Sequence, residues 1–223
     1  MDIISTQKQI SSKLKIHLER LGFETEEYSP HFHTVQFFQT RNKITKYISL
    51  QFYNDSNGIL QLRGFISSDE VNHILGKFID LKVNKEYCTI KDFGQKQTIS
   101  DGIENLNRIG KEKDLDQYVL AILGHIKSII LPFFDMFPDF GALNEFINKL
   151  SEREYTDWVH GQSTLKRLIL LSLTNDSKYF EYKEFKEQEY VSFVNTNESM
   201  WRPYYETFQS LVNYLESESN RFP

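Results

Sequence analysis

The sequence predicts an α+β fold, with an N-terminal helix and an antiparallel β-meander with a short crossing helix, followed by an all-helical C-terminal half. Before residue 67, several segments alternate apolar and polar residues with the period of two that is typical of strands covered on one side. After residue 100, apolar residues recur at steps of three and four, which is the spacing of helices. We therefore expect a sheet region, 1–110, and a helical bundle, 111–223, packed as one compact unit with almost no strand after residue 113.

An N-terminal helix and a three-stranded meander make up the first predicted part. Apolar residues on one face predict a helix over 5–21, and Gly22 directly after it is suited to a left-handed C-terminal cap. Asn57-Gly58 supplies the positive backbone angles of a tight hairpin turn. Alternating polarity then predicts strands over 34–40, 43–53 and 59–66.

The region between the meander and the central helix is less regular. Ser67 and Glu70 have the spacing of a capping box, which predicts the start of a short helix against the sheet. The segments 86–93 and 95–100 are rich in β-branched and aromatic residues on either side of a glycine, so we expect a second hairpin or an irregular flap there. A short helix around Leu106 follows.

The most apolar stretch of the chain is 114–136, and it predicts a helix that is buried on most sides. Asp114 is suited to cap its N-terminus, and Ile122, Ile126 and Ile129 are expected in the core. Pro132 lacks a backbone donor, so we expect a kink or a stop at this point.

Short antiparallel helices are expected in the rest of the chain. Asp139 is a predicted cap, and Ser151 with Glu154 forms a second predicted capping box. The segments 163–174 and 176–194 predict a helix hairpin, and Pro203 is expected to start a last helix that ends near Leu215.

Composition excludes several classes of function. The net charge is −5 over 223 residues, which gives no general attraction to phosphate backbones or anionic lipids. The single cysteine, Cys88, rules out an internal disulfide, and the polar N-terminus lacks the apolar core of a signal peptide. The apolar run in 119–134 is interrupted by polar residues and a proline, so we expect no transmembrane helix. We therefore predict a cytoplasmic protein that binds neither nucleic acid nor membrane.

No motif in the chain indicates a reaction, because phosphate-binding loops and nucleophile elbows are absent from the sequence. The sharpest metal candidates are His31 and His33, which have strand spacing, but two ligands are too few and we predict no metal site. Possible acid–base couples are Glu70 with His73 and Asp157 with His160. Structural roles are the favoured explanation, with Glu70 as the capping partner of Ser67 and Asp157 as a cap near Trp158. We assign no catalytic residue and no cofactor.

The aromatic content of the chain is unusually high, since 18 Phe, 12 Tyr and 2 Trp make up 14% of it. Tyr, Trp and Arg dominate interaction hot spots, so Trp201, Arg202 and Tyr205 are candidate partner-binding residues, with Tyr47 and Tyr53 on the outer face of the sheet as a second set. The alternative is that these aromatics fill the seams between helices.

The predicted last helix gives these aromatics an orientation. If the helix starts at Pro203, Tyr204 lies on the same stripe as Phe208 and Leu211 and faces the core. Tyr205 then points about 100° away and, with the two residues before the helix, is available to a partner.

Three segments resemble a family of bacterial domains of unknown function, some of whose members are similar to immunity or toxin-associated proteins. These are the LGF sequence at 21–23, ISLQFYNDSNGILQLRGF at 48–65 and ILPFFDMFPDFGALNEFI at 130–147. The resemblance covers roughly the first 150 residues and implies a helix-flanked antiparallel sheet and a role in binding another protein. We expect a non-enzymatic interaction or immunity-type protein, with a homodimer as a further possibility. The alternative is a hydrolase that uses the histidines and carboxylates named above.

Overall fold

The computed structural model describes residues 2–81, 89–91, 96–159 and 161–217. These residues form two compact units that are interleaved along the sequence, one made of 1–67 and 90–138 and the other of 68–89 and 139–223. The predicted boundary near residue 110 therefore lies inside a helix of the first unit. The predicted α+β class is confirmed, with a sheet in the N-terminal part and helices in the C-terminal part.

The first unit contains a five-stranded antiparallel sheet in the order β1-β2-β3-β4-β5. Its strands are β1 (Glu24–Thr25), β2 (Thr34–Arg41), β3 (Ile44–Phe52), β4 (Ile59–Ser68) and β5 (Ile90–Lys91). The three predicted strands correspond to β2, β3 and β4, and Phe37 pairs with Ile48 while Val35 pairs with Leu50. All four of these side chains are buried, so the period-two pattern does place one face of the sheet in the core.

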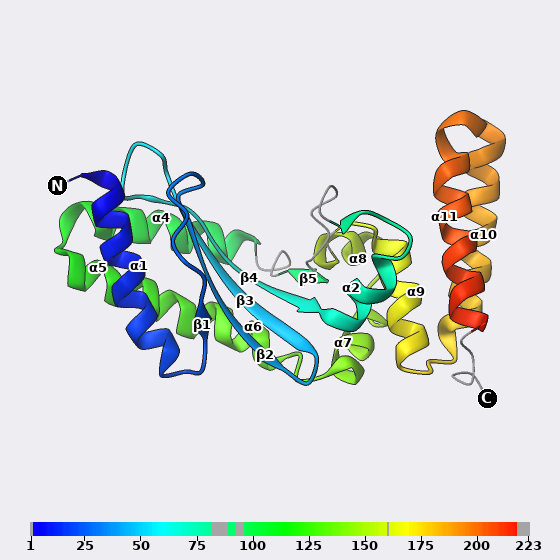
Figure 1. The fold of residues 1–223 in the computed structure, drawn as a ribbon, viewed down its shortest axis with the longest axis horizontal. Coiled ribbons are helices and arrows are strands. Elements are labelled where there is room, and N and C mark those ends of the chain that lie inside the picture. Colours follow the sequence, from blue (N-terminus) through cyan, green and yellow to red (C-terminus); the bar gives the residue numbers. More distant parts are fainter. Residues whose placement is uncertain (1, 82–88, 92–95, 160, 218–223) are drawn as a thin grey trace. The chain divides into compact units, whose positions relative to one another are not determined.

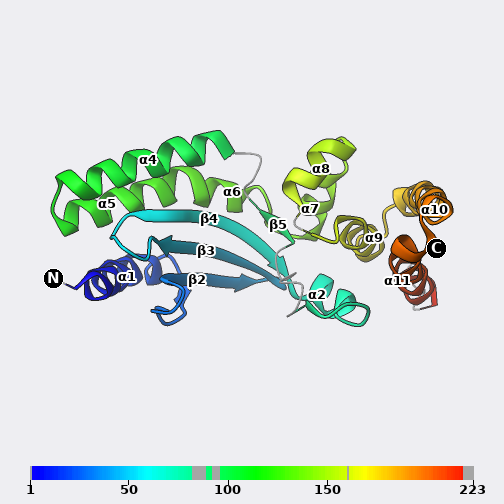
Figure 2. The ribbon, with the colours of Figure 1, turned by 90° about the horizontal axis from the view of Figure 1, so that it is seen from above.

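Helices lie along the sheet of the first unit (Figures 1 and 2). They are α1 (Ile3–Glu19), α4 (Lys96–Glu112), α5 (Leu115–His125), a π-helical segment (Ile126–Ile130) and α6 (Leu131–Asp135). Helix α1 packs against β1 and α5. Gly22 follows α1 with a φ of +84°, which confirms the predicted left-handed cap. Asp114 caps α5 by accepting a hydrogen bond from the backbone N–H of Gln117, as predicted.

Pro132 does not end the central helix. The helix passes through the π-helical segment just before the proline and continues as α6, so the missing donor falls where the hydrogen-bond ladder is already irregular. The buried Ile130 lies so close to β4 that a Cβ added to Gly64 would be 2.7 Å from its Cγ2 atom. Ile122 and Ile126 are buried as predicted, whereas Ile129 is half-buried at the margin of the stripe.

Helices α4 and α5 approach each other through glycines. An added Cβ at Gly102 would be 2.4 Å from a ring carbon of His125, and one at Gly110 would be 2.8 Å from the ring of Tyr118. The prediction of strand or flap over 95–100 was wrong for the described part, because 96–100 form the first turns of α4. The apolar stripe of this helix starts at Ile99, four residues before Ile103. The segment 86–93 lies outside the described residues except for 89–91, and the Cys88 position is also outside them.

The second unit is helical, and its described helices are α2 (Asp69–Leu75), α7 (Phe140–Ile147), α8 (Glu152–Trp158), α9 (Ser163–Leu173), α10 (Lys178–Thr196) and α11 (Glu198–Ser217). Asp139 caps α7, and Ser151 with Glu154 forms the predicted capping box of α8. The predicted box at Ser67 was wrong by one residue, since Ser68 is the cap and accepts from the N–H of Val71. No strand follows Lys91 among the described residues.

Candidate partner-binding surface

Helices α10 and α11 form a hairpin with one apolar seam. The seam is buried where it is lined by Tyr179, Tyr182 and Lys186 of α10 and by Phe208, Leu211 and Leu215 of α11. These residues repeat at steps of three, four and seven along each helix, so each set forms a single stripe. Two rings join the helices, because Tyr190 of α10 and Phe208 of α11 lie 5.0 Å apart at their centroids.

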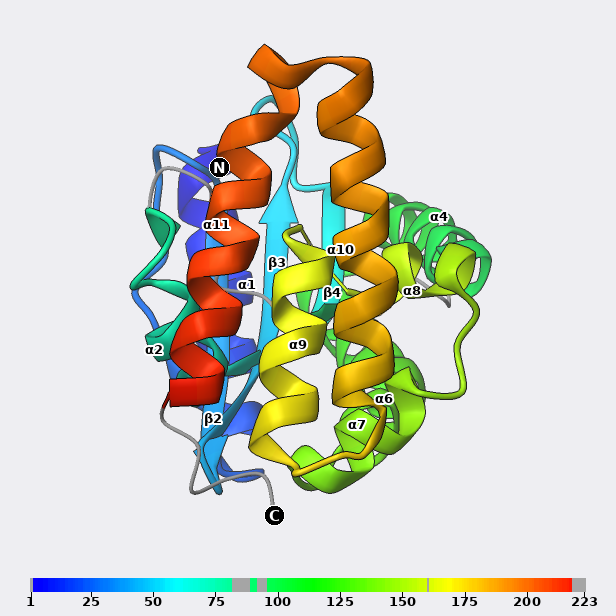
Figure 3. The same cartoon turned by 90° about the vertical axis from the view of Figure 1, so that its right-hand side faces the viewer.

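Helix α9 covers this seam over only part of its length. The Arg167 guanidinium lies over the ring of Tyr182, 4.4 Å from its centroid. One turn before it, the Thr164 side chain is hydrogen-bonded to the Tyr190 hydroxyl, and burial raises the pKa of that hydroxyl. Because α9 begins at Ser163, Tyr190 marks the level at which the cover ends. Figure 3 shows α10 and α11 running past the upper end of α9.

The same two stripes continue beyond Tyr190 with large apolar side chains. Phe193 lies eleven residues after Tyr182, and Tyr204 lies seven before Leu211, so both stay on the stripes that are buried lower down. Yet Phe193 is 40% exposed and Tyr204 is 51% exposed. We call Phe193, Met200, Trp201 and Tyr204 the tip cluster.

The tip cluster is held together by ring contacts. Phe193 stacks on Trp201 with centroids 4.8 Å apart, and Trp201 lies 5.7 Å from Tyr204. Met200 beside them is 55% exposed, and Trp201 is half-buried. Rings that pack on one another in this way are ordered without being covered, so they offer rigid apolar area to a partner.

Two of the three predicted residues of this segment lie at the tip, and the third does not point where we expected. Trp201 belongs to the cluster, and the exposed Arg202 forms an ion pair with Glu198. Tyr205 was predicted to point outward, but it is half-buried and stacks on Tyr190 and Phe208. Tyr204, which we expected in the core, is the exposed one.

An early start of the last helix and a missing cover explain this reversal. Helix α11 starts at Glu198, not at Pro203, because Asn197 accepts a hydrogen bond from the N–H of Met200 through its side chain. Asn197 was the local signal that sequence reasoning missed. Tyr204 does lie on the apolar stripe, but it is 51% exposed, and no further described helix of the second unit covers the stripe at its level (Figure 3).

The second predicted surface, on the sheet, is more polar. Tyr47 is half-buried and stacks on Phe65 of the neighbouring strand with centroids 4.8 Å apart. Tyr53 is 42% exposed at the end of β3, where its backbone carbonyl accepts a hydrogen bond from Gln7. Phe38 of β2 pairs with Tyr47, with ring centroids 6.1 Å apart. The polar Gln36, Ser49 and Gln51 lie on the same face, and these three residues and Phe38 are half-buried. The tip cluster therefore exposes more apolar area.

His33 has a structural role in the first unit. Its Nδ1 atom lies 2.9 Å from Oε1 of Gln7, a fully buried side chain. The same Gln7 oxygen accepts a hydrogen bond from the Tyr28 hydroxyl, while Gln7 Nε2 donates to the carbonyl of Ser56 at 2.6 Å. Gln7 thus ties α1 to two loops of the sheet, and His33 completes its hydrogen bonding. His31 is exposed and contacts Phe32.

The structure describes only part of the remaining candidate couples. His73 is exposed on α2, Asp157 is exposed on α8, and His160 lies outside the described residues. Within the described ranges, no group of three or more His, Cys, Asp or Glu side chains is placed to hold a metal ion.

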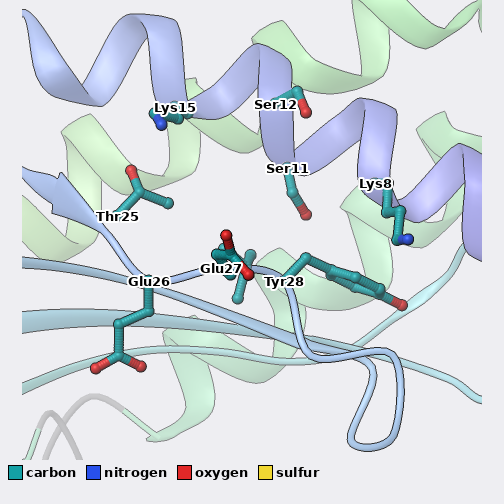
Figure 4. A pocket seen from close by; sticks show the side chains of 9 residues that line it. Lys8, Ser11, Ser12, Lys15, Thr25, Glu26, Glu27 and Tyr28 are labelled. Atoms are coloured by element: carbon teal, nitrogen blue, oxygen red, sulfur yellow. The ribbon is translucent and has the colours of Figure 1, made fainter.

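A cavity of about 320 Å³ lies between α1 and the strand segment around β1 (Figure 4). Lys8, Ser11 and Lys15 line it from the helix, and Glu27 and Tyr28 line it from the strand side. Burial, with a smaller effect of the nearby Asp2 carboxylate, raises the pKa of the Tyr28 hydroxyl. The Ser11 hydroxyl donates to the carbonyl of Gln7 at 2.9 Å, and the Tyr28 hydroxyl lies 3.4 Å from Nδ1 of His33.

The central helix of the first unit is also the one described helix that is long and apolar enough to cross a membrane. This run is Leu115–Asp135, and half of its most apolar window is buried inside the protein. The buried side chains include Ile126, Ile130 and Phe133, which form part of the core beside the sheet.

Comparison with known proteins gives no relative of this chain. No family model, no curated protein and no solved structure matches it.

Proposed function

We propose that this protein is a non-enzymatic binding protein that captures another protein with the tip cluster of its α10–α11 hairpin. The observation that carries this proposal is the exposure of Phe193, Met200 and Tyr204 beyond Tyr190, where Val194 of α10 is buried and Phe193 stacks on Trp201. Leaving a large apolar side chain in water forgoes about 1.5–3 kcal/mol of burial, and covering several of them supports association. The resemblance to immunity-type bacterial domains is the basis for proposing an immunity-type role in the cytoplasm.

A double substitution at the tip tests the proposal. We expect Phe193→Ala with Trp201→Ala to weaken partner capture by at least about 2 kcal/mol, which is a typical cost of losing a hot spot. Capture is measured by affinity pull-down from the native cytoplasm with quantitative mass spectrometry, and the affinity for the captured protein is then measured by titration.

The matched control is Phe185→Ala on the same helix. Phe185 is 44% exposed, close to the value for Phe193, but it is eight residues away and turned about 80° from the Phe193 stripe. The control should retain capture, and both variants should retain a cooperative thermal transition. If capture is lost equally in the control, or retained in the double variant, then the tip cluster is not the binding surface.

A further inference from the structure

We infer that the partner presents an amphipathic α-helix with basic residues beside its apolar face. This helix lies on the part of the seam beyond the N-terminus of α9 and forms a three-helix arrangement with α10 and α11. The inference rests on the proposed function and names the partner class for the same surface. The structural basis is that the seam already accepts one helix, α9, over its lower part and continues with the same pattern where α9 ends.

The dimensions of the hairpin match a short helical segment. Helix α9 has 11 residues, while α10 has 19 and α11 has 20. The cover ends at Tyr190 and α10 ends at Thr196, six residues later, so at 1.5 Å per residue about 9 Å of the seam, somewhat under two turns of helix, lies beyond α9. Phe193 and Tyr204 face this length of seam, because each is on the stripe that is buried beside α9.

Helix α9 indicates what the seam accepts. It contacts α10 through Thr164 and Arg167, and Leu168 and Leu171 on the same face of α9 are fully buried. It also places the Arg167 guanidinium 4.4 Å from the centroid of Tyr182 and 4.9 Å from that of Tyr155. A helix with branched aliphatic residues at three- and four-residue spacing and a cation over an aromatic ring fits the same chemistry at Trp201 and Tyr204.

Charge around the tip indicates the basic character of that helix. Between residues 186 and 206 the chain has four glutamates, one lysine and one arginine, which gives a net charge of −2, and Lys186 forms an ion pair with Glu189 at 2.8 Å. The single arginine, Arg202, is held by Glu198 in an ion pair. An acidic rim around an apolar centre favours a partner with a positive rim and disfavours an anionic membrane surface.

The test uses synthetic peptides of leucine and lysine as probes. The first has leucines at three- and four-residue spacing and forms an amphipathic helix with a basic face, and the second has the same composition in strict alternation, which is the pattern of a strand. A third peptide is the helical one with glutamate in place of lysine. Binding of fluorescently labelled peptides to the full chain is measured by anisotropy.

We expect the helical lysine peptide to bind, with an affinity that falls at least about 30-fold in the Phe193→Ala, Trp201→Ala variant and is unchanged in Phe185→Ala. The alternating peptide and the glutamate peptide should bind at least about 10-fold more weakly. Equal binding of the alternating peptide overturns the helical partner, and equal binding of the glutamate peptide overturns its basic character.

Other occupants of the seam are separate outcomes. Concentration-dependent dimerisation in sedimentation experiments, abolished by the double variant, assigns the seam to a second copy of this chain and overturns the inference. Flotation of the protein with phosphatidylcholine vesicles, if it depends on Trp201, assigns the seam to a membrane surface and also overturns the inference. If no peptide binds while capture of a protein still requires the tip cluster, the helical partner is wrong and the proposed function stands; if that capture also fails, the proposed function is wrong as well.

Discussion

The central helix of the first unit and the tip of the α10–α11 hairpin have the same kind of sequence pattern and opposite surroundings. In the central helix, the stripe through Ile122, Ile126 and Phe133 is fully buried. At the tip, the stripes through Phe193 and Tyr204 are 40% and 51% exposed at these residues. A periodic apolar stripe therefore predicts which face of a helix seeks cover, while the reach of the neighbouring elements decides how much of it is covered.

The largest effect that tests this contrast is expected in the central helix. Ile126→Ala removes a fully buried side chain and leaves a cavity, so the free energy of unfolding should fall by roughly 2–5 kcal/mol. Urea unfolding measures this loss, and partner capture at 25 °C should be retained in the folded fraction. A loss below about 1 kcal/mol would mean that the central helix is no better covered than the tip.

A second test uses pH, because the first unit has a half-buried histidine at the end of α5, His125, and residues 178–217 contain none. Burial lowers the pKa of the His125 imidazole, whose Nε2 atom has no hydrogen-bond partner among the described residues. The folded state therefore favours the neutral ring. The stability that the folded protein gains from keeping the His125 ring neutral is fully present above the unfolded pKa of about 6.5. It is lost as the pH falls from that value toward the folded pKa.

We expect the free energy of unfolding to decrease between pH 7.5 and pH 5.5, and this decrease to shrink in His125→Asn, which keeps a planar polar side chain without titrating. Urea unfolding at several pH values measures the slope. Hydrogen exchange should locate the loss in α4 and α5, where the His125 ring faces Gly102, and not in the hairpin. The same slope in wild type and variant would show that other groups cause it.

Local signals in the sequence were sufficient for much of the fold. Asp114 and Ser151 were identified as caps because the hydrogen bonds of a cap join residues two or three positions apart. The strand prediction over 95–100 failed because Thr98 and Ile99 favour strands in a short window, and the stripe that places them in α4 extends as far as Ile109. Pro203 was taken as a helix start because the side-chain cap at Asn197, six residues earlier, was overlooked.

The candidate site was predictable only in part. The sequence indicated Trp201 and Arg202 from residue type, and both lie at the tip. The sequence pattern placed Tyr204 on the correct stripe and still predicted the wrong exposure. The N-terminus of α9 at Ser163 sets how much of the stripe is covered, and it is set by the fold of a distant segment. Phe193 was not singled out, since nothing local distinguishes it from Phe180 or Phe185 on the same helix.

The smallest expected effect concerns the adjacent pair Tyr204 and Tyr205, which differ in surroundings and not in residue type. Tyr205 stacks on Tyr190 and Phe208 within the seam, whereas Tyr204 is half exposed and touches Trp201. Tyr204→Ala should therefore cost less than about 1 kcal/mol in urea unfolding, as substitutions at exposed sites usually do. Tyr205→Ala should cost clearly more, because it removes a half-buried ring from the contact between the two helices. The loss of affinity for the partner should have the opposite order, so Tyr204→Ala should weaken capture more than Tyr205→Ala does. If both substitutions destabilise the protein equally, a neighbouring element covers the tip in solution and the hairpin has no uncovered seam.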